Sequence, residues 1–229
     1  MVDDLFSAEP FTSMRSIAAL LISTALATTP PVAPTKWSCT IDTVVQAGNQ
    51  KKQGTSIAYQ SDAHQAWRYE STSHPSTLTL FNAAKGAGME MELDSTGTKC
   101  LAWCPPSSTY FNMIRVGNGK NGTSKATNAG AVWSWTDNLF VIAMDHKHLT
   151  LKAGAVPTEL VEEFTPFGKQ IGNGTSNFHS DFTTTVDDSK FTVSNIDTCQ
   201  QATNCQNVDF QGMAMTTETK RLLESLESL

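Results

Sequence analysis

The stretch "GMEMELDSTGTKCLAWCPP", residues 88–106, combines three patterns in one short run. Met89, Met91 and Leu93 alternate with acidic residues, and this period of two is typical of a half-buried β-strand. A polar turn follows, and then two cysteines, four residues apart, precede a pair of prolines. The run predicts a strand and a turn, and it leaves two interpretations of the cysteines: a redox or metal site, or part of a disulfide-linked scaffold.

Strand geometry limits the partners that Cys100 and Cys104 can have. On an extended segment their side chains share a face, with Cα atoms roughly 13 Å apart. A disulfide tolerates less than about 7 Å. Each therefore bonds to Cys39, Cys199 or Cys205, and the odd cysteine is free or pairs between chains. Because zinc prefers a C-x2-C pair and no histidine lies close in sequence, we expect disulfides and no metal here.

Alternating or β-branched and aromatic segments continue along the chain, separated by short polar or glycine-rich turns. The segments are residues 66–71, 76–81, 89–94, 110–116, 131–136, 139–151, 181–186 and 190–195. Asp137-Asn138 is a candidate hairpin turn. Helical pattern is limited to 157–164, with Thr158 as a candidate cap, and to the tail. The sequence predicts a mainly β fold built on a single strongly curved antiparallel sheet or half-barrel, with a few short helices.

The N-terminus has the pattern of a secretory signal peptide over residues 1–27. The apolar run "SIAALLISTALA" follows Met14-Arg15 and ends in an A-x-A cleavage pattern, and translation starts at Met1 or at Met14. The run is shorter than the roughly 20 apolar residues that span a membrane, so we expect no stable membrane span. A proline-rich linker (28–36), a disulfide-linked β domain (37–206) and a tail with a short helix (207–229) complete the predicted organisation.

Charge and glycosylation signals agree with export. The formal net charge of −6 and the lack of a basic stripe argue against binding to nucleic acid or anionic membranes. Two sequons, at Asn121 and Asn173, fall in glycine-rich, turn-like stretches where a glycan would be exposed. We expect a secreted, extracellular glycoprotein.

Catalytic motifs are absent from the sequence, which contains no G-x-S-x-G, H-E-x-x-H, G-x-G-x-x-G or P-loop pattern. No catalytic residue is therefore predicted. On a strand, His146 and His148 would share a face, and a metal-dependent enzyme that uses this pair is one alternative. The favoured interpretation is that these histidines mark where a hairpin strand leaves the core.

Large, soft apolar side chains are the most prominent remaining feature. They fill ordinary cores, and they also line cavities that accept variable hydrophobic ligands. The candidate pocket residues are Trp67, Tyr69, Leu78, Leu80, Met89, Met91, Leu93, Met113, Trp133, Trp135, Phe140, Ile142 and Met144. A second alternative is an extracellular adhesion or carbohydrate-binding module, in which an exposed Trp133 or Trp135 forms a platform for a sugar.

The order of these features resembles that of the ependymin-related proteins over roughly residues 37–206. The features are "WSC" with Cys39, "AWRYES", "GMEMELDSTGTKC", "GAVWSW", "VP" at 156–157 and the late cysteines. The resemblance implies a LolA-type fold, a bent antiparallel sheet with a pocket for acyl chains. It also implies non-enzymatic binding of lipids or other hydrophobic molecules outside the cell or in a lysosome-like lumen, with calcium interaction and homodimers. Cys104 and Cys205 have no clear counterpart in that family, so its disulfide pattern is not carried over.

Overall fold

The computed structural model describes residues 29–71, 75–83, 88–106, 110–117, 126–140, 143–152, 156–166, 172–203 and 205. The predicted signal peptide and the C-terminal tail lie outside these residues. The described part contains one sheet of 11 strands and two 3-10 helices. The elements are β1 (Lys36–Ala47), β2 (Gln50–Ser61), β3 (Ala66–Ser71), β4 (Thr77–Leu80), β5 (Met89–Leu93), β6 (Cys100–Cys104), β7 (Thr127–Ala129), β8 (Val132–Phe140), β9 (Ala143–Lys152), β10 (Val156–Pro166), β11 (Gly172–Phe178), η1 (Asp188–Phe191) and η2 (Ile196–Thr198).

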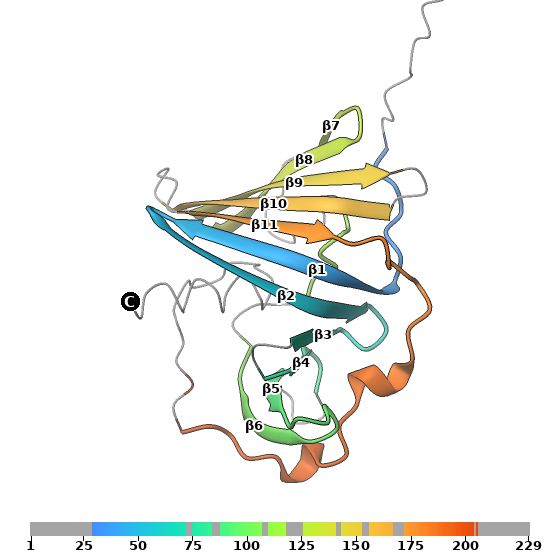
Figure 1. Ribbon diagram of the computed structural model, residues 1–229, viewed down its shortest axis with the longest axis vertical. Coiled ribbons are helices and arrows are strands. Elements are labelled where there is room, and N and C mark those ends of the chain that lie inside the picture. Colours follow the sequence, from blue (N-terminus) through green and yellow to red (C-terminus); the bar gives the residue numbers. More distant parts are fainter. Residues whose placement is uncertain are drawn as a thin grey trace, which may run out of the picture.

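The strand order is β6-β5-β4-β3-β2-β1-β11-β10-β9-β8-β7, and every pair is antiparallel. The chain first runs from β1 outward to the edge strand β6. It then crosses to the opposite edge at β7 and returns strand by strand to β11, which pairs with β1. The sheet bends strongly without closing (Figure 1). The predicted mainly β fold with one curved antiparallel sheet is confirmed.

The inner face of the bent sheet carries an aromatic-rich cluster, which we call the inner cluster. Because side chains alternate along a strand, every second residue of β1–β3 and β8–β11 points to this face. Its buried members are Ala33, Trp37, Cys39, Ile41, Ala58, Trp67, Tyr69, Met113, Ile114, Val116, Trp133, Trp135, Leu149, Leu160 and Phe178. Residue Ala33 comes from the predicted linker, which is therefore packed against the domain at this point.

Residues 110–117, the inner segment, cover this face without forming a strand. The side chains of Gln60 and Trp67 both donate to the Phe111 carbonyl, over 2.5 and 2.9 Å. Gln60 also accepts from the backbone N–H of Met113 over 3.1 Å. The prediction of a strand at 110–116 is wrong, because these side-chain partners replace a strand ladder and the apolar residues fill the inner face.

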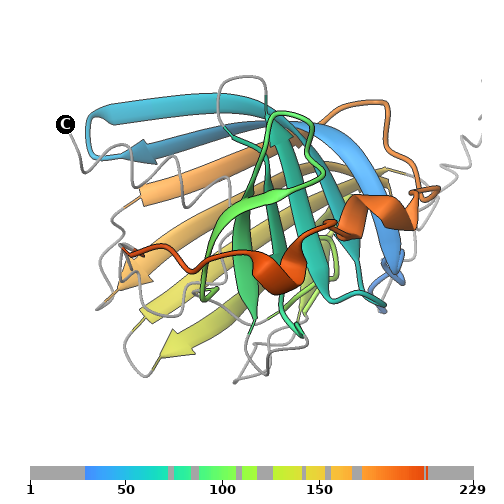
Figure 2. The same ribbon diagram turned by 90° about the horizontal axis from the view of Figure 1, so that it is seen from below.

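A second cluster, the outer cluster, lies on the opposite face of β3–β6. Its buried members are Ala66, Leu78, Ala83, Met89, Met91, Leu93, Cys100, Val186, Phe191 and Cys199. Residues 186–203 and 205, the strap, run across this face with η1 and η2 (Figure 2). The strands predicted at 181–186 and 190–195 are wrong: the first forms an isolated bridge between Thr183 and Ser38, and the second contains the end of η1.

Two disulfides fasten the strap to β6. Cys100 bonds to Cys199 and Cys104 bonds to Cys205, across sequence separations of 99 and 101. The strap also adds a parallel bridge at Gln201 to the outer edge of β6, at Trp103. The two β6 cysteines thus pair with distant partners, as strand geometry required, and the bridge covers an edge that would otherwise offer unpaired backbone groups.

Two further local predictions are wrong. The predicted helix at 157–164 is strand β10, because pairing with β9 and β11 on both sides outweighs its local preference. The predicted turn at Asp137-Asn138 lies inside β8, opposite Asp145 and Met144 of β9. Strand β8 continues to Phe140, which pairs with Ala143 of β9.

Candidate functional site

Aromatic rings of the sheet and of the inner segment pack together in the inner cluster, and we call them the aromatic wall. The ring of Trp67 lies 4.5 Å from that of Phe111 and 4.9 Å from that of Phe81, centroid to centroid, in edge-on contacts. At β1, Trp37 stacks on Phe182 with centroids 5.8 Å apart. Such rings offer broad apolar faces at low entropic cost, which suits the binding of variable hydrophobic molecules.

Four charged residues interrupt this wall and form what we call the buried ion cluster: Asp137, Asp145, Lys147 and Glu162. Lys147 Nζ lies 3.1 Å from Asp145 Oδ2, 3.2 Å from Asp137 Oδ2 and 3.7 Å from Glu162 Oε1. The side chains of Lys147, Asp145 and Glu162 are 2, 0 and 1% exposed. Three carboxylates therefore surround one ammonium group inside an apolar face.

Sheet register brings these residues together. Trp135, Lys147 and Glu162 face one another across β8, β9 and β10, and Asp137 pairs with Asp145 in the adjacent inner row. Trp135 Nε1 donates to Asp137 Oδ2 over 3.3 Å. The inner segment contributes the ring of Phe111, whose centroid lies 4.6 Å from Lys147 Nζ, within cation–π distance.

Burial and the charges of neighbouring groups compete in setting the pKa values of this cluster. Burial raises the pKa of Glu162 to about 8, against the attraction of Lys147, and it raises the pKa of Asp145 in the same way. Burial also opposes the charge of Lys147, but the surrounding carboxylates outweigh it and hold the pKa of Lys147 above its ordinary value. Within the described residues, Asp145 Oδ1 has no partner, whereas Asp145 Oδ2 and Glu162 Oε1 have the ammonium group of Lys147 as an ion-pair partner and no well-aligned hydrogen bond.

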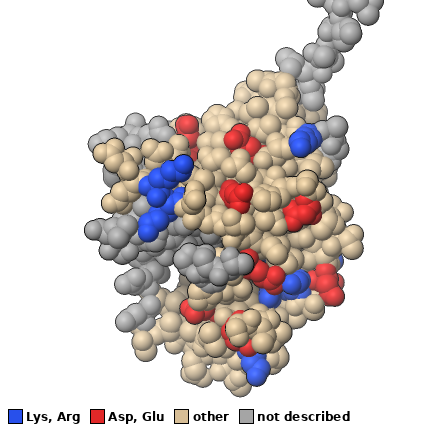
Figure 3. All heavy atoms as spheres, in the orientation of Figure 1, with Lys and Arg blue, Asp and Glu red and all other residues tan. Residues whose placement is uncertain are grey.

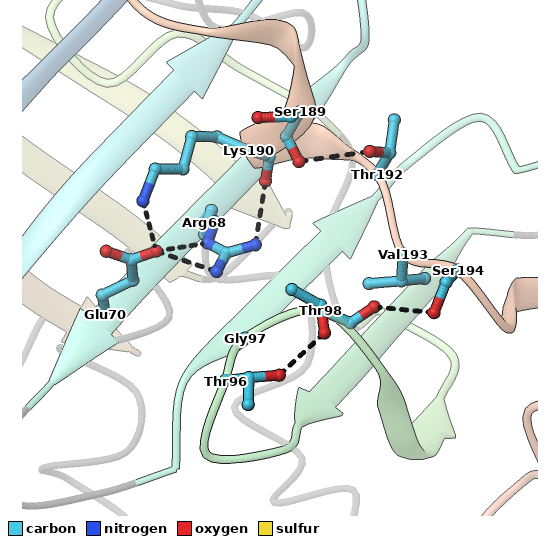
Figure 4. Close-up of a pocket in the computed structure, with 10 residues that line it drawn as sticks. All are labelled: Arg68, Glu70, Thr96, Gly97, Thr98, Ser189, Lys190, Thr192, Val193 and Ser194. Carbon is cyan, nitrogen blue, oxygen red and sulfur yellow. Dashed lines mark hydrogen bonds and ion pairs between the residues drawn. The ribbon is translucent and has the colours of Figure 1, made fainter.

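A polar cleft of about 390 Å³ lies on the other side of the sheet, between β3, the turn after β5 and the strap (Figure 4). Glu70 Oε1 accepts from Arg68 Nε (2.9 Å) and from Lys190 Nζ (2.8 Å), while Glu70 Oε2 accepts from the Tyr59 hydroxyl (2.9 Å). Arg68 Nη1 also donates to the Lys190 carbonyl over 3.1 Å.

Contacts in the polar cleft hold the strap against β3. Partial burial works to raise the pKa of Glu70, but hydrogen bonds from Lys190 and Tyr59 and the charge of Arg68 outweigh it and hold this pKa below its ordinary value. Gly97 borders the cleft with φ +67°, and a Cβ there would clash with Arg68 Nη2. The charged groups of the cleft therefore already have partners, and their contacts join β3 to residues of the strap.

The predicted pocket residues divide between the two faces. Trp67, Tyr69, Met113, Trp133 and Trp135 belong to the inner cluster. By contrast, Leu78, Leu80, Met89, Met91 and Leu93 pack in the outer cluster beneath the strap. Ile142 and the side chains of Phe140 and Met144 lie outside the described residues. The first group alone can line a common site, because strand alternation puts the second group on the opposite face.

The histidine pair lies on one face, as predicted, and that face is opposite to Lys147. His146 Nδ1 is 2.8 Å from Thr136 Oγ1, and His148 Nδ1 is 2.8 Å from Ser134 Oγ. Among the described residues, no group of three or more His, Cys, Asp or Glu side chains is arranged to hold a metal ion. The metal-enzyme alternative therefore gains no support from this part of the chain.

The structure bears on two predictions about the surface, the tryptophan sugar platform and the glycosylation sites. A sugar platform requires an exposed tryptophan, but Trp133 and Trp135 are each 5% exposed, so that requirement is not met. Asn173 lies within β11 and not in a turn, with its side chain half-buried, and Asn121 lies outside the described residues. Acidic and basic side chains are scattered among uncharged ones on the face shown in Figure 3.

The sequence contains a pattern that indicates the buried ion cluster, although the cluster was not among the predicted sites. Asp137 follows Trp133 and Trp135 at the same period of two, and Asp145 and Lys147 precede Leu149 in phase. A charged residue in phase with core residues of one strand points into the core. The sequence predicts a helix at 157–164, so it gives no strand pairing that would bring Glu162 next to Lys147.

The sequence matches no known family model and no curated protein. One solved structure with a similar chain is the crystal structure of an uncharacterized conserved protein from Thermus thermophilus. The two chains are 13% identical over 73% of this chain and 90% of the other, with a TM-score of 0.38. This likeness is too distant to support an assignment of fold or function.

Proposed function

We propose that this protein binds an apolar molecule, such as a lipid, against the inner face of its bent sheet, without catalysis. The observation that carries the proposal is an aromatic wall covered by an irregular segment, not by a second sheet. Side-chain contacts hold this cover to the sheet and its flanks: Gln60 and Trp67 donate to the Phe111 carbonyl, and Asp62 accepts from Tyr110, Asn112 and Arg115. Moving it exposes apolar surface without breaking a strand ladder.

The site of action that we propose is extracellular or lumenal. Two disulfides are typical of chains that fold in an oxidising compartment. None of the helices in the described part of the chain has the length and apolar character needed to cross a bilayer. The resemblance to ependymin-related proteins supports the same location, and calcium interaction, glycosylation and dimers remain predictions from the sequence.

The test uses the full chain secreted from eukaryotic cells with its disulfides intact. Native mass spectrometry and organic extraction should detect a co-purifying hydrophobic molecule, and the neutral fluorescent probe N-phenylnaphthylamine should bind saturably. Phe111→Ala should strengthen probe binding, because it removes a ring that covers Trp67. Leu101→Ala, at a residue 57% exposed on β6, is the matched control and should leave probe binding unchanged. Absence of both a co-purifying molecule and saturable probe binding would refute the proposal.

A further inference from the structure

The buried ion cluster contains three acidic side chains but only one lysine. Asp137, Asp145 and Glu162 surround Lys147, and the described residues offer no hydrogen-bond partner to Asp145 Oδ1 or to Glu162 Oε1. A buried carboxylate oxygen that lacks a hydrogen bond is unfavourable even beside an ammonium group, and such atoms in native proteins call for an explanation. Because the buried ion cluster lies on the aromatic wall, these carboxylate oxygens lie next to the proposed apolar site.

The missing partner is best supplied by an organic cation. Lys147 Nζ occupies the centre of the carboxylates, at 3.1 to 3.7 Å from their oxygens, so a compact metal ion has no open centre there. An alkylammonium head group needs no such centre, because its N–H groups can donate to Asp145 Oδ1 and Glu162 Oε1. The ring of Phe111 lies against Lys147 Nζ and the indole N–H of Trp135 donates to Asp137, so apolar ring surface for an alkyl chain adjoins the cluster.

We propose that the buried ion cluster is the polar end of the ligand site and that it selects amphiphiles with a protonated amine at one end of an apolar chain. This inference rests on the proposed function and narrows its ligand class. The ammonium group pairs with Glu162 and Asp145, while the chain lies along the aromatic wall.

Binding of such an amine is coupled to the release of a proton. Without ligand, burial keeps Glu162 largely protonated below about pH 8, and pairing with the ammonium requires its ionised form. The charged groups that face Glu162 are Asp137, Asp145 and Lys147 from β8 and β9, and its inner neighbour on β11 is Gly174. Amine affinity therefore rises with pH up to about 8, by at most about tenfold per pH unit for one proton.

The experiment compares three ligands with the same twelve-carbon chain, dodecylamine, dodecanol and dodecanoate, as competitors of N-phenylnaphthylamine. We expect dodecylamine to displace the probe at roughly tenfold lower concentration than dodecanol, the gain expected of one charge-assisted pair. Dodecanoate should be the weakest. Glu162→Gln should bring dodecylamine to the level of dodecanol, whereas Glu163→Gln, at the adjacent position on the opposite face of β10, should change neither.

The outcomes separate the two proposals. If dodecanol displaces the probe as well as dodecylamine does, or if the amine preference survives in Glu162→Gln, apolar binding stands and the inference about its head group is overturned. If none of the three displaces a probe that binds saturably, the inference is overturned; if the probe does not bind and no hydrophobic molecule co-purifies, the proposed function itself fails. The pH dependence of dodecylamine binding to the unmodified protein is a readout that needs no variant, and an affinity that does not change between pH 6 and 8 overturns the inference.

Discussion

The two clusters on opposite faces of the sheet are closed in different ways. The outer cluster packs methionine, leucine and phenylalanine beneath a strap that two disulfides join to β6. The inner cluster packs aromatic residues beneath a segment that hydrogen bonds hold, and it buries four charged side chains. In our proposal, stability and binding therefore belong to different faces: the disulfide-linked outer cluster is the scaffold, and the inner cluster carries the ligand site and a buried carboxylate oxygen of Asp145 without a hydrogen bond.

Among the changes that test this comparison, removing a disulfide should reduce stability most. In the variant Cys100→Ala/Cys199→Ala the bond between Cys104 and Cys205 stays closed, so the loop that opens consists of residues 100–104 and 199–205. For a loop this short the chain-entropy model predicts a loss of about 3 kcal/mol in the free energy of unfolding, measured by urea denaturation. Cys39→Ala, at the buried free cysteine of the inner cluster, is the control, and its loss should be about 1 kcal/mol. Equal losses in the two variants would contradict the idea that covalent closure stabilises the outer face.

Truncating a core residue of the outer cluster should reduce stability without reducing binding. Met91 is fully buried beneath the strap, so Met91→Ala should lower the free energy of unfolding by about 3 kcal/mol. Affinity for N-phenylnaphthylamine should stay within twofold, because the probe binds at the other face. A large drop in probe affinity in a variant that is still fully folded would place the ligand in the outer cluster instead.

The turn that borders the strap should tolerate no side chain at Gly97. Gly97→Ala combines a positive φ of 67° with a Cβ that meets Arg68, so we expect a loss of about 2 kcal/mol in thermal unfolding experiments. Gly48 has φ +57° with nothing within 4 Å of the added Cβ, so Gly48→Ala should cost about 1 kcal/mol. If both variants lose the same amount, the contact with Arg68 has no energetic weight.

The smallest effect concerns how stability varies with pH at the inner face. The folded state raises the pKa of Glu162 from 4.5 to about 8, so it keeps a proton that the unfolded state has released between these values. The free energy of unfolding therefore falls as pH rises through this window, by about 1 kcal/mol between pH 6 and 7.

Glu162→Gln should flatten this dependence in urea denaturation measured at each pH, although Asp145, whose pKa is also raised, contributes in the same direction. Glu163→Gln is the control on the opposite face and should keep the slope of the unmodified protein. A slope that Glu162→Gln leaves unchanged would mean that Glu162 is already ionised in the folded state.

Sequence patterns predicted local geometry well and missed what depends on distant pairing. Alternation located β3, β4 and β5, and strand spacing excluded a bond between Cys100 and Cys104. Alternation does not tell which face of a strand points to the inside of the bend. The sequence therefore predicts Met91 and Trp67 in one pocket, although they lie on opposite faces of the sheet. It also predicted a helix where β10 forms, because the partners of β10 come from elsewhere in the chain.

By itself the sequence determined the strand character of the chain and the need for long-range disulfides, because the side-chain period and the Cα spacing of a strand are properties of a few consecutive residues. The tertiary structure alone decided that Cys39 is the unpaired cysteine. It alone brought Asp145, Lys147 and Glu162 into contact, because that depends on the register between strands and on the bend of the whole sheet. The chemistry of the inner face follows from that register.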